Sequence, residues 1–342
     1  MVFYAPRMAL LFVSLLACSQ AKSGDRKQDS TQIETQTLRH QGTVGTVSYP
    51  ELAADLGYLA PLELEYVGNT ISGPQDIQTV VTGDVDFGLA FHGAIIKLIA
   101  AGAPIRAVVG GYGVDEETFS GFFVKEDSPI RDPRDLIGKQ VAMNTLGAHA
   151  EFMTREYLSR AGLTAEEIKK VTLVVLPPVN TEQLLRAGNV DIASLTGIFR
   201  DKALARGGLR QVFTDFDLYG KFTAGSYVFT KRFIEKNPNT VRKFVDGVGR
   251  AIEWARTTPR EQVIERQRAI IAKRKRQEND EVVQYWKSTG IAGTGGQLRD
   301  RELQMWIDWL VKDGELKPGQ LKPQDVYTNE FNPAARSERN ER

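Results

Sequence analysis

Residues 82–88 read TGDVDFG, and residues 187–193, at an offset of 105, read AGNVDIA. Each copy follows an apolar pattern of helical period. Further along, the apolar runs 105–109 and 209–213, one residue out of that offset, both predict strands. A chance similarity is the alternative, because the shared Gly-Asx-Val-Asp segment is short. The two copies indicate an internal repeat.

The segments before the two copies also correspond in kind. Residues 43–48 and 139–144 have strand composition, and each leads into an amphipathic stretch that stops at a glycine. Residues 62–67 and 171–176 predict second strands. The order β-α-β-α-β-α-β therefore occurs twice, and such alternation requires right-handed crossovers and mainly parallel sheets. The sequence predicts an α/β protein with two similar doubly wound lobes.

Length and charge exclude several classes of protein. The chain has 342 residues, enough for about two domains, and its 42% hydrophobic and 25% charged residues are typical of a soluble protein with a real core. Lysine and arginine number 44 against 43 aspartate and glutamate, a net charge of +1. This balance offers no basic surface for nucleic acid, so we expect no nucleic-acid partner.

The amino terminus predicts export. Residues 8–18 read MALLFVSLLAC, an apolar run too short to span a hydrocarbon core of about 30 Å. With Arg7 before it, the run predicts a signal peptide over residues 1–18. Residues 15–18 resemble a lipobox whose Cys18 would be lipidated, although Leu16 departs from the small residue usual there. Cleavage after Ala21 is the alternative.

Residues 19–37 predict a flexible tether, because they contain too few large apolar side chains to repay the entropy of ordering. Cys18 is the only cysteine in the sequence, which excludes an internal disulfide and any thiolate metal site. We expect no metal and no cofactor.

Four segments in this order resemble the substrate-binding proteins of ABC importers. They are GDVDFG at 83–88, GAPIR at 102–106, DLIGK at 135–139 and AGNVD at 187–191. The chain is most similar to the nitrate, sulfonate and taurine binders related to thiamine-pyrimidine proteins, the SsuA/THI5-like or NMT1-like group. The resemblance covers about residues 38–290, and its specificity lies in the order and spacing of the segments.

The resemblance implies a two-lobed, periplasmic-binding-protein-like fold of type II, with two doubly wound, mainly parallel sheets joined by hinge strands. Lobe one would comprise residues 38–124 and 226–342, including the C-terminal helices, and lobe two residues 125–225. The chain would cross between lobes near 122–125 and 225–230. A small-molecule solute would bind in the cleft between the lobes, which would close on it.

The same resemblance implies a setting for the protein. It would be a monomer in the periplasm or another extracytoplasmic space, and it would deliver its solute to an ABC permease in the membrane. Its own membrane contact would be limited to a lipid anchor at Cys18.

The candidate ligand-binding residues lie in the loops after the predicted strands, since ligands of open parallel sheets bind beyond the carboxyl ends of the strands, at helix N-termini. The candidates are Ser48, Tyr49, Ser72, Gly73, Phe91, His92 and Tyr112 in lobe one, and Asn144, Thr145, Gly147, Ala148, His149, Asn180, Thr196 and Gly197 in lobe two.

Few lysine or arginine residues fall in these loops. A sulfonate or carboxylate would therefore be held by helix dipoles and hydroxyls. An uncharged or aromatic solute would fit equally well, with the aromatic candidates covering its apolar part.

The candidates also have structural interpretations. Ser72 and Asn180 fit helix caps as well as ligand contacts. The three aromatic candidates fit the core of lobe one. His92 and His149 stand at corresponding helix starts in the two lobes, and each fits a hydrogen-bonded structural histidine as well as a ligand contact.

The sequence gives little support for catalysis. It contains three histidines without a helical metal-binding pair, no catalytic cysteine in the expected mature chain and no Gly-x-Ser-x-Gly elbow. It also lacks the cysteine-rich iron motif of eukaryotic pyrimidine-synthesising relatives. We expect a non-enzymatic binder of a sulfonate, nitrate, taurine or pyrimidine-like solute. The alternatives are an exported enzyme on the same fold, with His92 or His149 as base, and a ligand-sensing lipoprotein.

Overall fold

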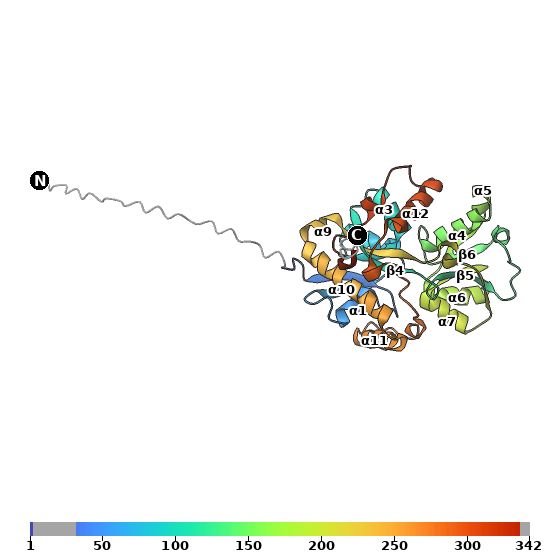
Figure 1. Ribbon diagram of the computed structural model, residues 1–342, viewed down its shortest axis with the longest axis horizontal. Helices are drawn as coiled ribbons and strands as arrows, with labels where there is room; N and C mark the ends of the chain where they lie inside the picture. Colours follow the sequence, from blue (N-terminus) through green and yellow to red (C-terminus); the bar gives the residue numbers. More distant parts are fainter. Residues whose placement is uncertain (3–31, 336–342) are drawn as a thin grey trace. The chain divides into compact units, whose positions relative to one another are not determined.

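The structure is a computed structural model that describes residues 1–2 and 32–335 (Figure 1). Residues 3–18 of the expected signal peptide, together with Cys18 and both expected cleavage sites, lie outside the described residues. Residues 33–335 lie within one compact unit. Of the helices within the described residues, none combines the length and the apolar character needed to cross a membrane.

The two repeat copies adopt the same local structure. Helix α2 (Gly73–Thr82) ends at Gly83, with φ 84°, and helix α6 (Pro178–Arg186) is followed by Gly188, with φ 76°. Glycine adopts this left-handed conformation without steric cost. The residue after each glycine donates its N–H to the carbonyl five positions earlier, at 3.0 Å in both copies. Both helices therefore end in the hydrogen-bonding pattern of a Schellman motif.

The aspartate after the valine in each copy fastens the repeat to a strand of its own lobe. The carboxylate of Asp86 accepts the N–H of Arg39 at 2.7 Å, and that of Asp191 accepts the N–H of Gln140 at 2.9 Å. The backbone N–H of each aspartate donates to the carbonyl of the same partner, at 3.0 and 3.2 Å. The shared Asx-Val-Asp segment thus bonds to a strand in the same way in both lobes, so the repeat has a structural role.

Lobe one, as we use the term for the structure, contains two small sheets. One pairs β1 (Thr37–Gly42) with β2 (Glu63–Asn69) in parallel. The other has the order β3 (Gly88–Phe91), β10 (Phe222–Thr230), β4 (Ile105–Val114). Strand β10 runs antiparallel to both of its neighbours.

Lobe two contains one five-stranded sheet. Its order is β7 (Thr172–Val175), β6 (Gln140–Met143), β8 (Ile192–Thr196), β5 (Ser120–Lys125), β9 (Leu209–Thr214). Strand β6 is parallel to β7 and β8, whereas β5 is antiparallel to β8 and β9. The strand that arrives from the other lobe, β10 or β5, is the antiparallel one in each. The predicted α/β fold with two parallel-rich sheet systems is confirmed.

Alternating side chains bury both faces of the lobe-two sheet. Val141 and Met143 belong to an apolar cluster that includes side chains of α4 (His149–Arg160), and Ala142, between them, packs with those of α6 and α7 (Gly197–Ala205). Figure 1 shows α4 on one side of β5 and β6, and α6 and α7 on the other. Such burial on both faces is what helices on two sides of a parallel sheet produce.

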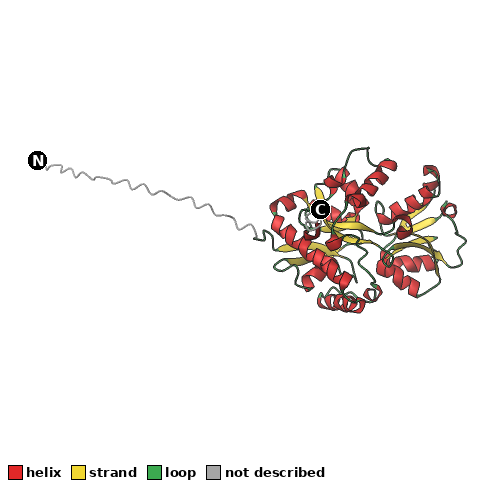
Figure 2. Ribbon diagram, in the orientation of Figure 1, coloured by secondary structure: helices red, strands yellow, loops and turns green. Residues whose placement is uncertain are grey.

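Lobe one is layered in the same way. Tyr227 of β10 joins the apolar cluster of α10 (Pro238–Thr257), and the next residue, Val228, joins that of α3 (His92–Ala100) and α12 (Asp300–Lys312). The strands lie among these helices (Figure 2). The remaining elements are α1 (Tyr49–Asp55), η1 (Pro133–Leu136), α5 (Ala165–Ile168), α8 (Asp215–Tyr219), α9 (Lys231–Lys236), α11 (Arg260–Lys273), η2 (Val283–Tyr285), η3 (Thr294–Gly296) and α13 (Pro323–Val326).

The first strand is not where the sequence predicts it. Residues 43–48 form a turn and a loop, and the strand is β1, which ends at Gly42. Gly45 has φ 72°, a conformation that interrupts a strand, and Thr46 donates its N–H to the Thr43 carbonyl at 3.3 Å. The β-branched composition of this segment was therefore misleading.

The chain crosses between the lobes earlier than predicted at both places. Because β5 pairs within the lobe-two sheet and β10 within lobe one, the crossings fall at residues 115–119 and 215–221. The predicted boundary between residues 124 and 125 lies inside β5. The sequence showed apolar strands there, but it could not show which sheet each one joined.

The predicted tether also ends too late. Glu34 accepts the backbone N–H groups of Asn239 and Thr240 at 3.1 and 2.9 Å, at the first turn of α10. That helix has no side-chain bond from its own cap residue, so Glu34 supplies the missing acceptor. Ile33 packs against the core, and residues 19–31 of the tether expected over 19–37 lie outside the described residues.

We predict that Asp86→Ala lowers the free energy of unfolding by about 1–3 kcal/mol, because it leaves the Arg39 N–H without its acceptor. The matched control is Asp84→Ala, since Asp84 is exposed and its carboxylate accepts the hydroxyl of the exposed Thr82. We expect that control to stay within about 0.5 kcal/mol of wild type. Urea unfolding of both variants measures the difference, and equal losses would contradict the role assigned to Asp86.

Candidate functional site

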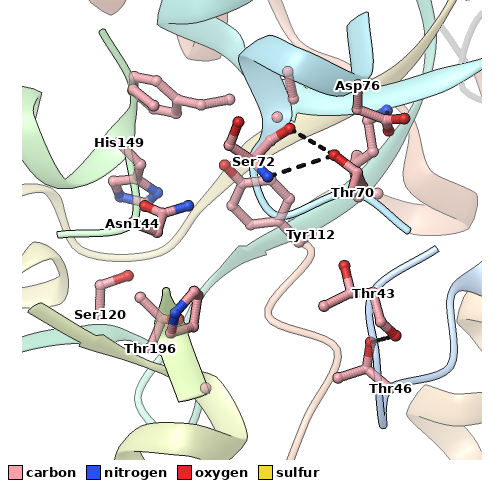
Figure 3. Close-up of a pocket in the computed structure, with 18 of the residues that line it drawn as sticks. Thr43, Thr46, Thr70, Ser72, Asp76, Tyr112, Ser120, Asn144, His149 and Thr196 are labelled. Carbon is pink, nitrogen blue, oxygen red and sulfur yellow. Dashed lines mark hydrogen bonds between the residues drawn. The ribbon is translucent and has the colours of Figure 1, made fainter. Parts of the chain in front are cut away.

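A cavity of about 480 Å³ lies between the two lobes. From lobe one it is lined by β3, β4 and the residues that follow β1, β2 and β4, and from lobe two by β8, the residue after β6 and the starts of α4, α6 and α7. Figure 3 shows Thr43, Thr46 and Thr70 on one side of this space, and Ser120 and Thr196 on the other. This is the edge at which the sequence predicts a ligand.

Eleven of the fifteen predicted ligand-binding residues line the cavity. They are Ser48, Tyr49, Ser72, Gly73, Phe91, Tyr112, Asn144, Ala148, His149, Thr196 and Gly197. The structure therefore brings together residues far apart in the sequence and on both lobes. That they bind a ligand stays a prediction.

The other four candidates, Thr145, Gly147, Asn180 and His92, are not among the lining residues. His92 is fully buried, its Nε2 lies 2.6 Å from Ser226 Oγ, and burial lowers its pKa to about 3. His92 is therefore a hydrogen-bonded structural histidine, the first of the two interpretations given for it. Asn180 lies inside α6, which begins three residues earlier than a cap at Asn180 would require, and therefore caps nothing.

The helix starts around the cavity differ between the lobes. In lobe one, Ser48 and Ser72 cap α1 and α2 with their own side chains and also line the cavity, whereas Phe91, the cap residue of α3, makes no side-chain cap bond. In lobe two, the cap residues Ala148 and Thr196 make no side-chain bond to α4 and α7. Backbone N–H groups at such uncapped starts carry partial positive charge and can donate to a ligand.

His149 connects the lobes at the cavity wall. Its ring stacks on Phe91 of lobe one, with centroids 4.8 Å apart and planes at 16°, and lies 6.2 Å from the ring of Tyr112. Its Nε2 is 3.1 Å from Oδ2 of the buried Asp215, an ionic contact without hydrogen-bond geometry. The other Asp215 oxygen accepts the Ser120 N–H at 2.9 Å. Asp215 therefore orients the histidine edge.

Asp76 is a cavity residue that sequence reasoning missed. Its Oδ2 accepts the Leu89 N–H at 2.7 Å, while its Oδ1 is buried without a hydrogen-bond partner among the described residues. Burial raises its pKa to about 7. The repeat could have identified it, because the offset of 105 aligns Asp76 with Thr181, another lining residue.

The lining hydroxyls of Thr43, Thr46, Thr70 and Ser120 were missed as well (Figure 3). The first two lie in the segment that the sequence predicted as a strand, and Ser120 begins a strand that was assigned to the wrong lobe. A correct placement of β1 and β5 would have found all but Thr70.

The cavity wall carries no fixed positive side chain. Among the lining residues in the part of the chain from 32 to 335, none is lysine or arginine. Aromatic side chains are abundant, and hydroxyls and uncapped N–H groups supply the polar contacts. The same part of the chain contains no group of three or more histidine, cysteine, aspartate or glutamate side chains able to hold a metal ion. The arrangement suits a small organic solute held by stacking and hydrogen bonds.

Comparison with known proteins assigns a family. Residues 52–262, more than half of the 342-residue chain, match the family described as NMT1/THI5 like. No curated protein sequence matches the chain. The family predicted from the order of the four sequence segments is confirmed.

Solved structures share the fold. They include the periplasmic aliphatic sulphonate binding protein SsuA from Escherichia coli, with TM-score 0.64 and 21% identity over 85% of this chain and 91% of that one. The periplasmic nitrate-binding protein NrtA from Synechocystis PCC 6803 has TM-score 0.67 and 15% identity over 89% of both chains. The desulfurization enzyme DSZB has TM-score 0.60 and 18% identity over 90% of this chain and 100% of that one. The two-lobed periplasmic-binding-protein-like fold is confirmed.

The Asp76 carboxyl predicts a pH-dependent stability. Its pKa rises from about 3.8 to about 7 on burial, so the stabilisation by its protonated form is complete below about pH 4 and is lost as the pH rises through about 7. The full effect is on the order of 4 kcal/mol. Asp76→Asn removes this titration, so the stability of the variant relative to wild type should increase between pH 4 and pH 8.

Urea unfolding at several pH values measures this difference. Asp84→Asn is the control, since Asp84 is exposed and lies two positions after the end of the same helix. Parallel stability curves for wild type and Asp76→Asn would contradict the burial of an ionisable carboxyl at this position.

Proposed function

Because this chain belongs to the NMT1/THI5-like family, we propose that it is the extracytoplasmic solute-binding protein of an ABC importer. The observation that carries the proposal is the cavity that both lobes line at the carboxyl ends of their strands. A solute there contacts both lobes at once, so its binding energy favours the closed arrangement of the lobes over an open one. The closed protein then delivers the solute to a membrane permease.

The solute in this proposal is small and organic or anionic: a sulfonate, nitrate, taurine or a pyrimidine-like compound. The names of the structural neighbours SsuA and NrtA, a sulphonate binder and a nitrate binder, support this range. The uncapped starts of α4 and α7 can hold an acceptor group without a cationic side chain. The rings of Phe91 and Tyr112 cover an apolar portion.

The expected setting belongs to the same proposal. The protein acts as a monomer in the periplasm or another extracytoplasmic space, and Cys18 carries a lipid anchor. The alternative amino terminus, produced by cleavage after Ala21, leaves the binding function unchanged.

An exported enzyme is the second candidate function. It is favoured by the fold shared with the desulfurization enzyme DSZB and by the contact between His149 and the buried Asp215, an arrangement that can orient a catalytic base. A ligand-sensing lipoprotein, which would report to a membrane receptor, is the third.

A binder and an enzyme differ in what happens to the ligand. We predict that a thermal-shift screen of small sulfonates, carboxylates, nitrate, pyrimidines and aromatic acids finds a compound that raises the melting temperature with its concentration. Prolonged incubation followed by chromatography should recover that compound unchanged. Turnover would reject the binder in favour of the enzyme, and genes for a permease and an ATPase beside this gene would favour the importer over the sensor.

Replacement of the two histidines tests the site. We predict that His149→Ala weakens binding of the compound found in the screen by about tenfold, because it removes a ring at the cavity wall. The matched control, His92→Asn, should destabilise the fold by breaking the contact with Ser226 and leave the affinity within about twofold. Isothermal titration calorimetry measures both affinities. An unchanged affinity in His149→Ala would remove this residue from the site.

A further inference from the structure

One carboxylate oxygen in the cavity wall lacks a partner. Asp76 is 5% exposed and lines the cavity, and its Oδ1 is buried without a hydrogen bond within residues 32–335. An unsatisfied buried acceptor costs about 1–3 kcal/mol, and more when it is charged. Native proteins leave few such atoms, so this one calls for an explanation.

The position of Asp76 is built by close packing. A Cβ on Gly88 would lie 2.9 Å from the backbone oxygen of Asp76, so the absence of a side chain at Gly88 lets α2 approach β3. This approach brings the carboxyl to the Leu89 N–H at 2.7 Å, which fixes one oxygen and leaves the other free. Oδ1 is therefore held in place by the fold.

The nearby hydroxyls do not supply the missing donor. Thr79 donates to the backbone oxygen of Asp76 at 2.7 Å, and Thr70 donates to the Ser72 carbonyl at 3.1 Å. Tyr227, the titratable side chain that faces Asp76 from β10, makes no hydrogen bond to Asp76 Oδ1. The lining residues between 32 and 335 also include no lysine or arginine, so no described side chain supplies the donor to Oδ1.

The repeat shows that this acceptor is a feature of lobe one alone. Thr181 holds the position of Asp76 in lobe two, lines the cavity, and donates its hydroxyl to the Pro177 carbonyl at 3.1 Å. Lobe two instead presents the uncapped starts of α4 and α7, which are donors. The cavity thus has a fixed acceptor on one wall and donors on the other.

We propose that Asp76 selects a solute that carries an N–H donor, a primary amine or an aromatic amino group, which bonds to Asp76 Oδ1 while the acceptor end of the solute faces lobe two. This inference rests on the proposed function and names the substrate class within it. A simple anion such as nitrate leaves Oδ1 unpaired, and so does an alkanesulfonate without an amine. Both are disfavoured relative to an amine-bearing counterpart of the same size.

Matched pairs of probes test the proposal, because each pair keeps the sulfonate end and exchanges an amine for a methyl group. One pair is taurine and 1-propanesulfonate, and the other is 4-aminobenzenesulfonate and 4-methylbenzenesulfonate. Isothermal titration calorimetry on the wild-type chain should give at least tenfold tighter binding of the amine member in at least one pair. Tenfold corresponds to about 1.4 kcal/mol.

The variant Asp76→Asn sharpens the test. An asparagine keeps an acceptor for the Leu89 N–H and turns the free position into a donor, so preference for the amine should fall below about twofold or reverse. The control Asp84→Asn, on the exposed residue two positions after the end of α2, should keep the wild-type preference. Thermal unfolding of each ligand-free variant confirms that it is folded.

The outcomes separate this inference from the proposed function. Equal binding of both members of each pair, or an amine preference that survives Asp76→Asn, would overturn the role of Asp76 and leave a solute binder in place. Failure of all four probes to bind would also overturn the inference as stated. The wider screen described above decides the binder function independently, since it includes compounds without an amine or a sulfonate.

Discussion

The stack of Phe91 on His149 joins the two lobes at the cavity, and the position of the site depends on it. The contact continues into the interior, where Phe91 packs edge-on against Phe152 of α4 at 5.1 Å and against Trp306 of α12 at 4.7 Å. Trp306 is fully buried. Aromatic pairs of this kind contribute about 0.5–1.5 kcal/mol each beyond the apolar area that they bury. Elements from both lobes and from the C-terminal helices therefore share one apolar core, and His149 lies at its edge toward the cavity.

The lobes are also joined elsewhere, by polar contacts of the segment after α11 with α7. Lys202 pairs with Glu281 at 2.7 Å, and Lys287 with Asp201 at 3.2 Å. Glu281 is about half exposed, and such pairs contribute about 0–1 kcal/mol. Separation of the lobes on this side costs far less than separation of the buried aromatic rings. The physical expectation is a motion that keeps the aromatic contact and opens the polar side.

The internal repeat made the fold predictable from the sequence, because Gly83 and Gly188 have to adopt a conformation that few other residues tolerate. Local composition gave a wrong prediction at residues 43–48, because this segment has the composition of a strand but forms a loop around Gly45. Local sequence could not predict strand pairing either, since it does not show which sheet an apolar strand joins. Asp76 escaped notice because a carboxylate in the first turns of a helix is usually solvated and favourable there. Only the tertiary approach of α2 to β3 makes it a buried acceptor.

The two repeat copies share the positions that build the fold and differ at positions that line the cavity. The glycine, the valine and the aspartate after it are the same in both copies. In each lobe the glycine ends a helix and the aspartate fastens a strand. The positions that differ at the same offset face the cavity: Asp76 stands opposite Thr181 in the alignment, and Phe91 opposite Thr196. A symmetric pair of lobes would offer a solute two equal walls and no preferred orientation. At these two positions lobe one has a carboxylate and an aromatic ring where lobe two has hydroxyls, so in the proposed function the two walls favour one orientation of a solute with unlike ends.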